Sequence, residues 1–251
     1  MILSMVNQKG GVGKTTTAVS LTAALTEKGK RVLLVDFDPQ ANATSGMGVD
    51  KQKIEKSVYD VVIDGVPAES VIQHTKYGDL LPSSADLAGA GIELVAMEKR
   101  EFRLRDALKP LKDGYDYIII DCPPSLELLT LNALCAADRV MIPVQCEYYA
   151  LEGLSDLMTT LRAVKKAYLP TISIFGLVLT MYDGRTNLSM QVAQEVRRHF
   201  PGKVFASVIP RNVRLSEAPS YGEPITVYDR TSRGADAFRK LADEIIAKEG
   251  Y

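Results

Sequence analysis

The sequence has few of the residues that build metal centres or disulfide frameworks. Among its 251 residues there are two histidines and three cysteines, and no two cysteines have a CxxC spacing. Two histidines are too few for the usual histidine-based metal sites. Without a secretory leader before them, Cys122, Cys135 and Cys146 are expected to be reduced and mostly buried. These absences favour a cytoplasmic protein.

Long apolar runs and an excess of one charge are also missing. The first apolar stretch, residues 1–6, runs directly into a glycine-rich loop, so it is too short for a signal peptide or a membrane span. The net charge of -1 excludes a uniformly basic surface, so any contact with nucleic acid must come from a local patch. No repeat, low-complexity stretch or linker divides the chain. We therefore expect a single domain over residues 1–251.

Apolar strands alternate with helical stretches along the chain. Their apolar positions are continuous rather than alternating, which is typical of a parallel sheet buried between two helix layers. The strands are expected at 2–6, 31–35, 117–120, 139–144, 172–180 and 204–209. The helices are expected at 15–28, 86–111, 126–137, 151–167, 188–199 and 232–247. This order predicts an α/β fold, doubly wound and mostly parallel, with ligands gathered outside the carboxyl ends of the strands.

The stretch "NQKGGVGKTTT" follows the first predicted strand and reads as a phosphate-binding loop. Its glycines allow backbone N–H groups to approach phosphate oxygens, and the next helix directs its positive dipole end at them. Lys14 would reach the β- and γ-phosphates, and Thr15 would ligate Mg²⁺. Gln8 stands where the usual motif has its first glycine, and Lys9 precedes the loop, so the motif is a variant.

Acidic residues follow two other predicted strands. Asp36 and Asp38 come after the second strand, and Asp121 follows "YIII". In P-loop proteins an aspartate at such a strand end holds Mg²⁺. Asp121 could instead cap the next helix, and Asp36 could be a purely structural acid. The Pro39 that follows Asp38 opens a short polar loop that we expect to move.

Five segments of the chain form one recognisable pattern. They are "KGGVGKTTT", "LLVDFDPQANATSGMG", "YDYIIIDCPPSLELLTLNAL", "PVQCEYYALEGL" and "VIPRNVRLSEAPSYGEPI". Together they resemble the ParA/Soj family of chromosome- and plasmid-partitioning ATPases, and the resemblance covers residues 2 to about 247. This P-loop NTPase family belongs to the deviant Walker A class, which also contains MinD.

The resemblance implies a Mg²⁺-dependent ATPase that works as an ATP-sandwich homodimer. Lys9 of one subunit would reach phosphates held by the other, as an arginine finger does. Lys14 would act with it, and Asp38 would position the attacking water once its loop closes. The ATP-binding residues would be Lys9, Gly10, Gly11, Val12, Gly13, Lys14, Thr15, Thr16, Pro210 and Asn212. The metal residues would be Thr15, with Asp36 and Asp121 through water.

One position departs from the family pattern at the adenine pocket. Some relatives have an asparagine there after the fifth strand, whereas this chain has Met181. We therefore place more weight on Asn212 than on Met181 as a base-reading residue.

The family also implies two macromolecular partners. Its dimers bind double-stranded DNA without sequence preference, which would place the protein on the nucleoid, and a ParB-type protein stimulates hydrolysis. Residues 181–214 hold six arginines and lysines against two acids. Arg185 and Arg214 are the leading DNA-binding candidates, although they could be ordinary solvated side chains.

Two alternatives remain open. A MinD-like membrane-cycling ATPase needs a basic amphipathic C-terminus, whereas "FRKLADEIIAKEGY" mixes both charge signs, so no stable membrane association is expected. A metabolic synthetase of the same loop class is the other alternative, but no second substrate pocket can be identified from the sequence.

Overall fold

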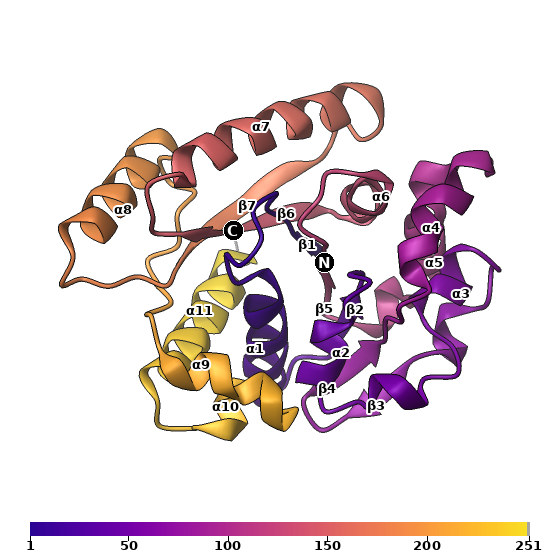
Figure 1. Cartoon of the computed structure of the whole chain (residues 1–251), viewed down its shortest axis with the longest axis horizontal. Helices are drawn as coiled ribbons and strands as arrows, with labels where there is room; N and C mark the ends of the chain where they lie inside the picture. Colours follow the sequence, from indigo (N-terminus) through magenta and orange to yellow (C-terminus); the bar gives the residue numbers. More distant parts are fainter. Residues whose placement is uncertain (250–251) are drawn as a thin grey trace.

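The computed structural model describes residues 1–249, which form one seven-stranded sheet between two helix layers (Figure 1). The strand order is β3-β4-β2-β5-β1-β6-β7, and every neighbouring pair is parallel except β3 and β4. The strands are β1 (Ile2–Met5), β2 (Val32–Asp36), β3 (Gln73–Thr75), β4 (Gly78–Leu81), β5 (Tyr117–Asp121), β6 (Arg139–Gln145) and β7 (Ser173–Thr180). The predicted fold class is confirmed.

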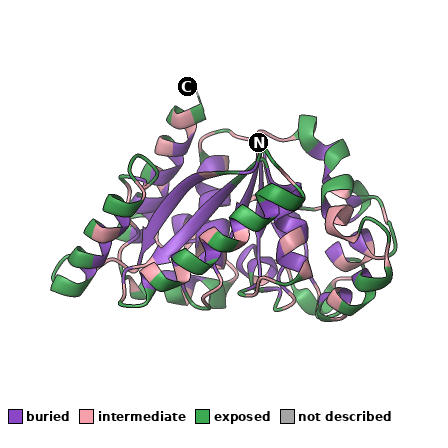
Figure 2. Ribbon diagram, turned by 90° about the horizontal axis from the view of Figure 1, so that it is seen from above, coloured by how far each residue is buried: buried purple, intermediate pink, exposed green. Residues whose placement is uncertain are grey.

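The central strands are buried on both faces, as their continuous apolar sequences predict. Every residue of β1, β2 and β5 is buried (Figure 2). One apolar cluster lies where α1 (Lys14–Glu27) and α11 (Arg233–Glu249) cover the sheet. The cluster on the other face includes side chains from α6 (Leu128–Ala136) and α7 (Ala150–Ala167). The sheet is therefore a fixed support for the loops at its edges.

Most of the remaining helices are short, and several lie where no helix is expected from the sequence. They are α2 (Asn42–Gly46), α3 (Val58–Val62), α4 (Leu87–Glu93), α5 (Arg103–Leu108), α8 (Asn187–His199), α9 (Val213–Glu217) and α10 (Ile225–Tyr228). The helices predicted at 15–28, 126–137, 151–167, 188–199 and 232–247 are confirmed to within a few residues. None of the helices in the described part of the chain is both long and apolar enough to cross a membrane. The last two residues of the predicted C-terminal segment, Gly250 and Tyr251, lie outside the described residues.

Two predictions of secondary structure are wrong. The continuous helix at 86–111 is instead α4, α5 and three 3-10 turns, because Met97 is extended and Lys99 has a φ of 51°. The strand at 204–209 is reduced to an isolated bridge to Leu177. The amides of Phe205 and Ile209 donate to β7 carbonyls at 2.9 and 2.8 Å, but the residues between them do not pair with the strand. There the amides of Ala206 and Ser207 donate to the carboxylate of Glu244 at 2.7 and 3.0 Å.

The parallel register brings three strand ends to one edge of the sheet. Met5 and Asp36 are both register partners of Asp121. The segments that follow β1, β2 and β5 therefore leave the sheet side by side. These are the segments in which the sequence predicts phosphate and magnesium chemistry.

Candidate functional site

The glycine-rich loop joins β1 to α1 and is anchored on both sides. Gly11 and Gly13 have φ values of 74° and 88°, a backbone conformation that side-chain-bearing residues seldom adopt. The Thr180 hydroxyl donates to the Val12 carbonyl at 2.8 Å, and the Asn7 amide donates to the Pro143 carbonyl at 2.8 Å. The loop is thus held between the ends of β6 and β7, with the N-terminus of α1 behind it.

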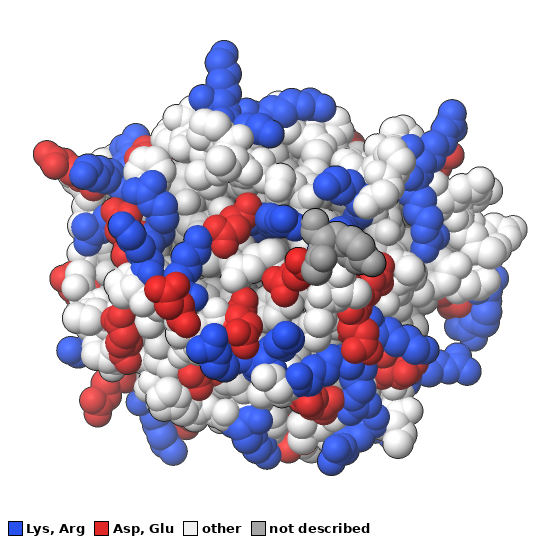
Figure 3. Space-filling view, turned by 180° about the vertical axis from the view of Figure 1, so that it is seen from behind, with Lys and Arg blue, Asp and Glu red and all other residues white. Residues whose placement is uncertain are grey.

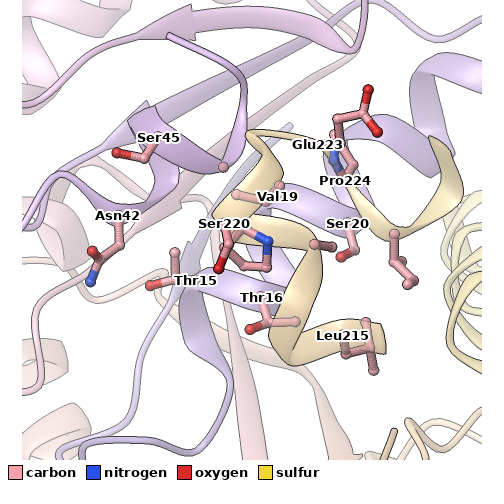
Figure 4. A pocket seen from close by; sticks show the side chains of 14 residues that line it. Thr15, Thr16, Val19, Ser20, Asn42, Ser45, Leu215, Ser220, Glu223 and Pro224 are labelled. Carbon is pink, nitrogen blue, oxygen red and sulfur yellow. The ribbon is translucent and has the colours of Figure 1, made fainter. Parts of the chain in front are cut away.

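Lys14 and the two threonines that follow it begin α1. Lys14 is buried, and its Nζ donates to the Lys9 carbonyl at 3.1 Å. Burial lowers the pKa of Lys14, while Asp121 and Asp38 oppose that shift. Thr15 and Thr16 line a cavity of about 380 Å³, which Figure 4 shows between α1, α2 and the segment 215–225. Ser45 and Glu223 also line this cavity.

Asp121 is a fully buried acid at the end of β5. Both of its carboxylate oxygens are buried and have no hydrogen-bond partner among the described residues. Burial raises the pKa of Asp121 well above its ordinary value, and the nearby Asp36 raises it further. A divalent cation would compensate such a carboxylate, so Asp121 and the Thr15 hydroxyl fit a Mg²⁺ site. Within residues 1–249 no three His, Cys, Asp or Glu side chains cluster, so phosphates and water would supply the other ligands.

Asp36 is equally buried but its oxygens are engaged. The amide and hydroxyl of Thr44 donate to one oxygen at 2.6 and 2.7 Å, and the Asp38 amide donates to the other at 3.3 Å. Burial raises the pKa of Asp36 to about 6 despite these bonds. Asp36 therefore holds the start of α2 and the Asp38 loop in place. Its role toward Mg²⁺ stays a prediction.

The Asp38 loop is packed rather than open. Asp38 is 7% exposed, and its Oδ1 accepts from the Gln40 amide at 2.9 Å. Its carbonyl accepts from the Ser83 hydroxyl at 2.8 Å and the Ala41 amide at 2.9 Å, and Ala41 has a φ of 52°. The Ser83 amide donates to the Thr44 hydroxyl at 3.0 Å. Thr44 and Ser83 are positioning residues that sequence reasoning missed, although Ser83 closely follows the end of β4.

Lys9 lies at the outer rim of the loop. Its ammonium forms an ion pair with Glu147, which follows β6, and lies 5.8 Å from the ring centroid of Tyr149. The Lys9 amide donates to Asn7 Oδ1 at 3.0 Å, which fixes the backbone. Sequence reasoning also missed Glu147, although its position just after a predicted strand was an available signal.

The predicted adenine-binding residues lie around a second cavity of about 340 Å³. Its lining includes Gly13, Thr16, Met181, Pro210 and Asn212, so it adjoins the glycine loop. Met181 has a φ of 50°. The Asn212 side chain caps α9 by accepting from the Arg214 amide at 2.8 Å. Pro210 and Asn212 therefore lie together beside the loop, and their contact with adenine stays a prediction.

The two predicted DNA-binding arginines are exposed and each has acidic partners. The Arg185 guanidinium donates to Asp183 at 2.7 Å and holds the pKa of that carboxyl well below its usual range. Arg214 contacts Glu217 at 2.8 Å and Asp229 at 3.6 Å. Mixed charge is also seen on the face in Figure 3, where lysines and arginines lie among acids.

Known proteins provide an independent comparison. An AAA domain family model matches residues 1–174. The chain is 57% identical over 248 residues to the sporulation initiation inhibitor protein Soj of Bacillus subtilis (strain 168), covering 98% of both. It is 51% identical over 250 residues to the chromosome partitioning protein ParA of Myxococcus xanthus (strain DK1622), covering 99% of this chain and 88% of that protein.

A solved structure is similar over the whole chain. It is described as cobyrinic acid a,c-diamide synthase from Mycobacterium smegmatis with bound ADP and magnesium. The sequence identity is 40%, the TM-score is 0.87, and the match covers 100% of this chain and 96% of that one.

Proposed function

The chain belongs to the Soj/ParA family of chromosome-partitioning ATPases, and from this premise we propose that it is an ATP-driven switch for DNA segregation. It hydrolyses ATP with Mg²⁺ as cofactor. In the proposed cycle the ATP-bound chain dimerises, binds DNA without sequence preference, and is released when a ParB-type protein stimulates hydrolysis. This would place the protein on the nucleoid.

The glycine loop and Lys14 would hold the triphosphate. Backbone N–H groups of Gly10 to Gly13 would donate to the phosphate oxygens, and the N-terminus of α1 would add its dipole. Lys14 would exchange its bond to the Lys9 carbonyl for the β- and γ-phosphates. Thr15 and Asp121 would hold Mg²⁺, which supplies charge neutralisation across those phosphates. Pro210 and Asn212 would contact the adenine.

Asp38 and Lys9 would act on the hydrolytic step from opposite sides. Asp38 would position the attacking water and accept its proton, which the second carboxylate oxygen can do while Oδ1 accepts from the Gln40 amide. Lys9 would reach phosphates held by the partner subunit and neutralise the charge that develops on the transferred phosphoryl group. The observation that carries this proposal is the position of Lys9. It is 37% exposed at the rim of the loop, while Lys14, Asp38 and Asp121 are buried.

Two neighbouring functions make different predictions. A MinD-like protein would bind lipid in its ATP state instead of DNA. The 40% identity to a structure described as a diamide synthase favours a synthetase, but the 57% identity to Soj over nearly the whole of both chains favours partitioning. We therefore propose DNA as the partner.

Gel-shift binding to a random-sequence duplex tests the proposal. The assay compares ADP, ATP, and ATP with Asp38→Ala, with liposome sedimentation as the parallel control. We expect DNA binding in the two ATP conditions and none with ADP. ATP-dependent liposome binding without DNA binding would favour the MinD-like function, and neither activity would favour a synthetase.

A further inference from the structure

The ion pair between Lys9 and Glu147 links two segments that meet only through the strand order. Lys9 follows β1 and Glu147 follows β6, and these strands are neighbours in the sheet. The two side chains are 37% and 33% exposed, and Tyr149 lies beside the Lys9 ammonium. No other ion pair involving either residue is found in the described part of the chain.

The backbone on each side of the pair is held in place. The Lys9 amide donates to Asn7, whose side chain donates to the Pro143 carbonyl in β6. The Cys146 amide donates to the Thr180 carbonyl at 3.2 Å, and the Glu147 carbonyl accepts from the Ala150 amide at 3.0 Å. The pair is therefore built into the fold, because hydrogen bonds other than the ion pair hold both backbones in place.

We propose that Glu147 is a latch that holds Lys9 to its own chain and thereby opposes formation of the ATP dimer. This inference rests on the proposed action of Lys9 across the dimer. Lys9 cannot neutralise the partner's phosphates while it is paired with Glu147, so each chain must break this contact on dimerisation. The triphosphate carries more negative charge than one carboxylate, so the exchange is favourable once the partner's site is in reach.

The size of the effect follows from the exposure of the pair. Partly exposed ion pairs shift an equilibrium by about 1.4- to 5-fold. A symmetric dimer breaks two of them, so removal of the latch should tighten dimerisation by about 2- to 30-fold. Basal ATP turnover at subsaturating protein should rise with the dimer fraction. An effect of this size changes the fraction of dimer without preventing dimerisation.

Glu147→Gln tests the latch, because it removes the charge and retains most of the side-chain volume. The dimer dissociation constant is measured by sedimentation velocity with a non-hydrolysable ATP analogue, together with basal turnover. Glu152→Gln in the first turn of α7 is the matched control, and Glu147→Asp keeps the charge. We expect tighter dimerisation for Glu147→Gln alone, and a smaller advantage over wild type at high salt, which screens the pair. Unchanged or weaker dimerisation, or an equal gain for Glu152→Gln, would overturn the latch.

Lys9→Gln separates failure of the latch from failure of the proposed function. If Lys9→Gln has wild-type dimerisation and stimulated turnover, Lys9 does not act across the dimer and both proposals fall. If Lys9→Gln is defective while Glu147→Gln matches wild type, only the latch falls.

Discussion

The two sides of the glycine loop, here called its inner and outer flanks, differ in how deeply their charged side chains are buried within one chain. The inner flank, toward β2 and β5, contains Asp36, Asp38 and Asp121, which are at most 7% exposed. The outer flank, toward β6, contains Lys9 and Glu147 together with Tyr148 and Tyr149. These two tyrosines are 76% and 61% exposed and stack edge to face on one another.

This difference separates the binding of ATP from its hydrolysis. The hydrogen bonds of the inner flank, and the Asp121 carboxylate that fits a Mg²⁺ site, lie within a single chain. On the outer flank, Lys9 is directed to its own Glu147 rather than to its own phosphate site. We infer that one chain can bind ATP and Mg²⁺, whereas efficient hydrolysis needs a second chain.

Loss of the outer flank should have the largest effect on catalysis. Lys9→Ala should lower stimulated ATP turnover by about 10³- to 10⁵-fold, the range for cations supplied in trans. Binding of a fluorescent ATP analogue to single chains should stay at the wild-type level. Lys53→Ala, at an exposed lysine outside the site, is the control. Full turnover by Lys9→Ala would remove the distinction between the flanks.

Loss of the inner-flank acid should impair turnover but leave the dimer intact. Asp38→Ala should slow hydrolysis by about 10²- to 10⁴-fold, because the attacking water loses its positioning group. Size-exclusion chromatography with ATP should show accumulated dimer. Asp50→Ala is a matched control, because Asp50 accepts from the Gln52 amide in the same type of turn. An Asp38→Ala protein that stays monomeric with ATP would show that the inner flank also builds the interface.

The buried acids of the inner flank should lower the free energy of unfolding when they are ionised. The pKa of Asp36 is raised to about 6 and that of Asp121 is raised well above its ordinary value, so the folded state holds protons that the unfolded state releases. For Asp36 the stability from this source is present below about pH 4 and is lost as pH rises through about 6, and for Asp121 it is also lost as pH rises. Without Mg²⁺ at pH 8, Asp121→Asn should therefore raise the free energy of unfolding by about 1–3 kcal/mol.

Asp36→Asn should raise the free energy of unfolding less than Asp121→Asn does, because hydrogen bonds from Thr44 already stabilise the Asp36 charge. Urea denaturation at pH 5 and pH 8 measures both changes, with the exposed Asp64→Asn as the control. At pH 5 the gain from Asp121→Asn should shrink. Destabilisation by Asp121→Asn at pH 8 would mean that an ionised Asp121 has a partner within the protein.

The exposed arginines should give the smallest effects. Arg185→Ala or Arg214→Ala should each reduce the slope of log affinity for random DNA against log salt by about 2, because the dimer loses one phosphate contact from each chain. ATP turnover without DNA should not change. Arg105→Ala is the matched control, because Arg105 also pairs with an adjacent acid, Asp106. Equal slopes for all three variants would assign DNA binding to other side chains.

The fold and the glycine loop were predictable because their signals are contiguous in the sequence. Continuous apolar strands indicate burial on both faces, and "GGVGKTT" holds the whole loop in one segment. The helix at 86–111 was not predictable from apolar spacing, because the left-handed backbone at Lys99 interrupts it. The strand at 204–209 was predicted from its apolar residues, but the carboxylate of Glu244 in α11, rather than a neighbouring strand, accepts from two of its amides.

The supporting residues of the site escaped prediction because they meet across the sheet. Ser83 reaches the Asp38 carbonyl only because β4 pairs with β2, and Glu147 reaches Lys9 only because β6 pairs with β1. Apolar periodicity predicts strands but not their order. The positions of Asp36 and Asp121 were predictable from strand ends, whereas their different hydrogen bonding depended on Thr44.

Mixing two inactive variants tests most directly whether Lys9 acts in trans. Lys9→Ala and Asp38→Ala chains are combined with ATP, dimer formation is followed by sedimentation, and turnover is measured against each variant alone. In a mixed dimer the Lys9→Ala chain keeps its own Asp38 and receives Lys9 from its partner, so one site is restored. Random mixing should then recover about a quarter of wild-type turnover. Mixed dimers that form without any recovery would show that Lys9 acts within its own chain.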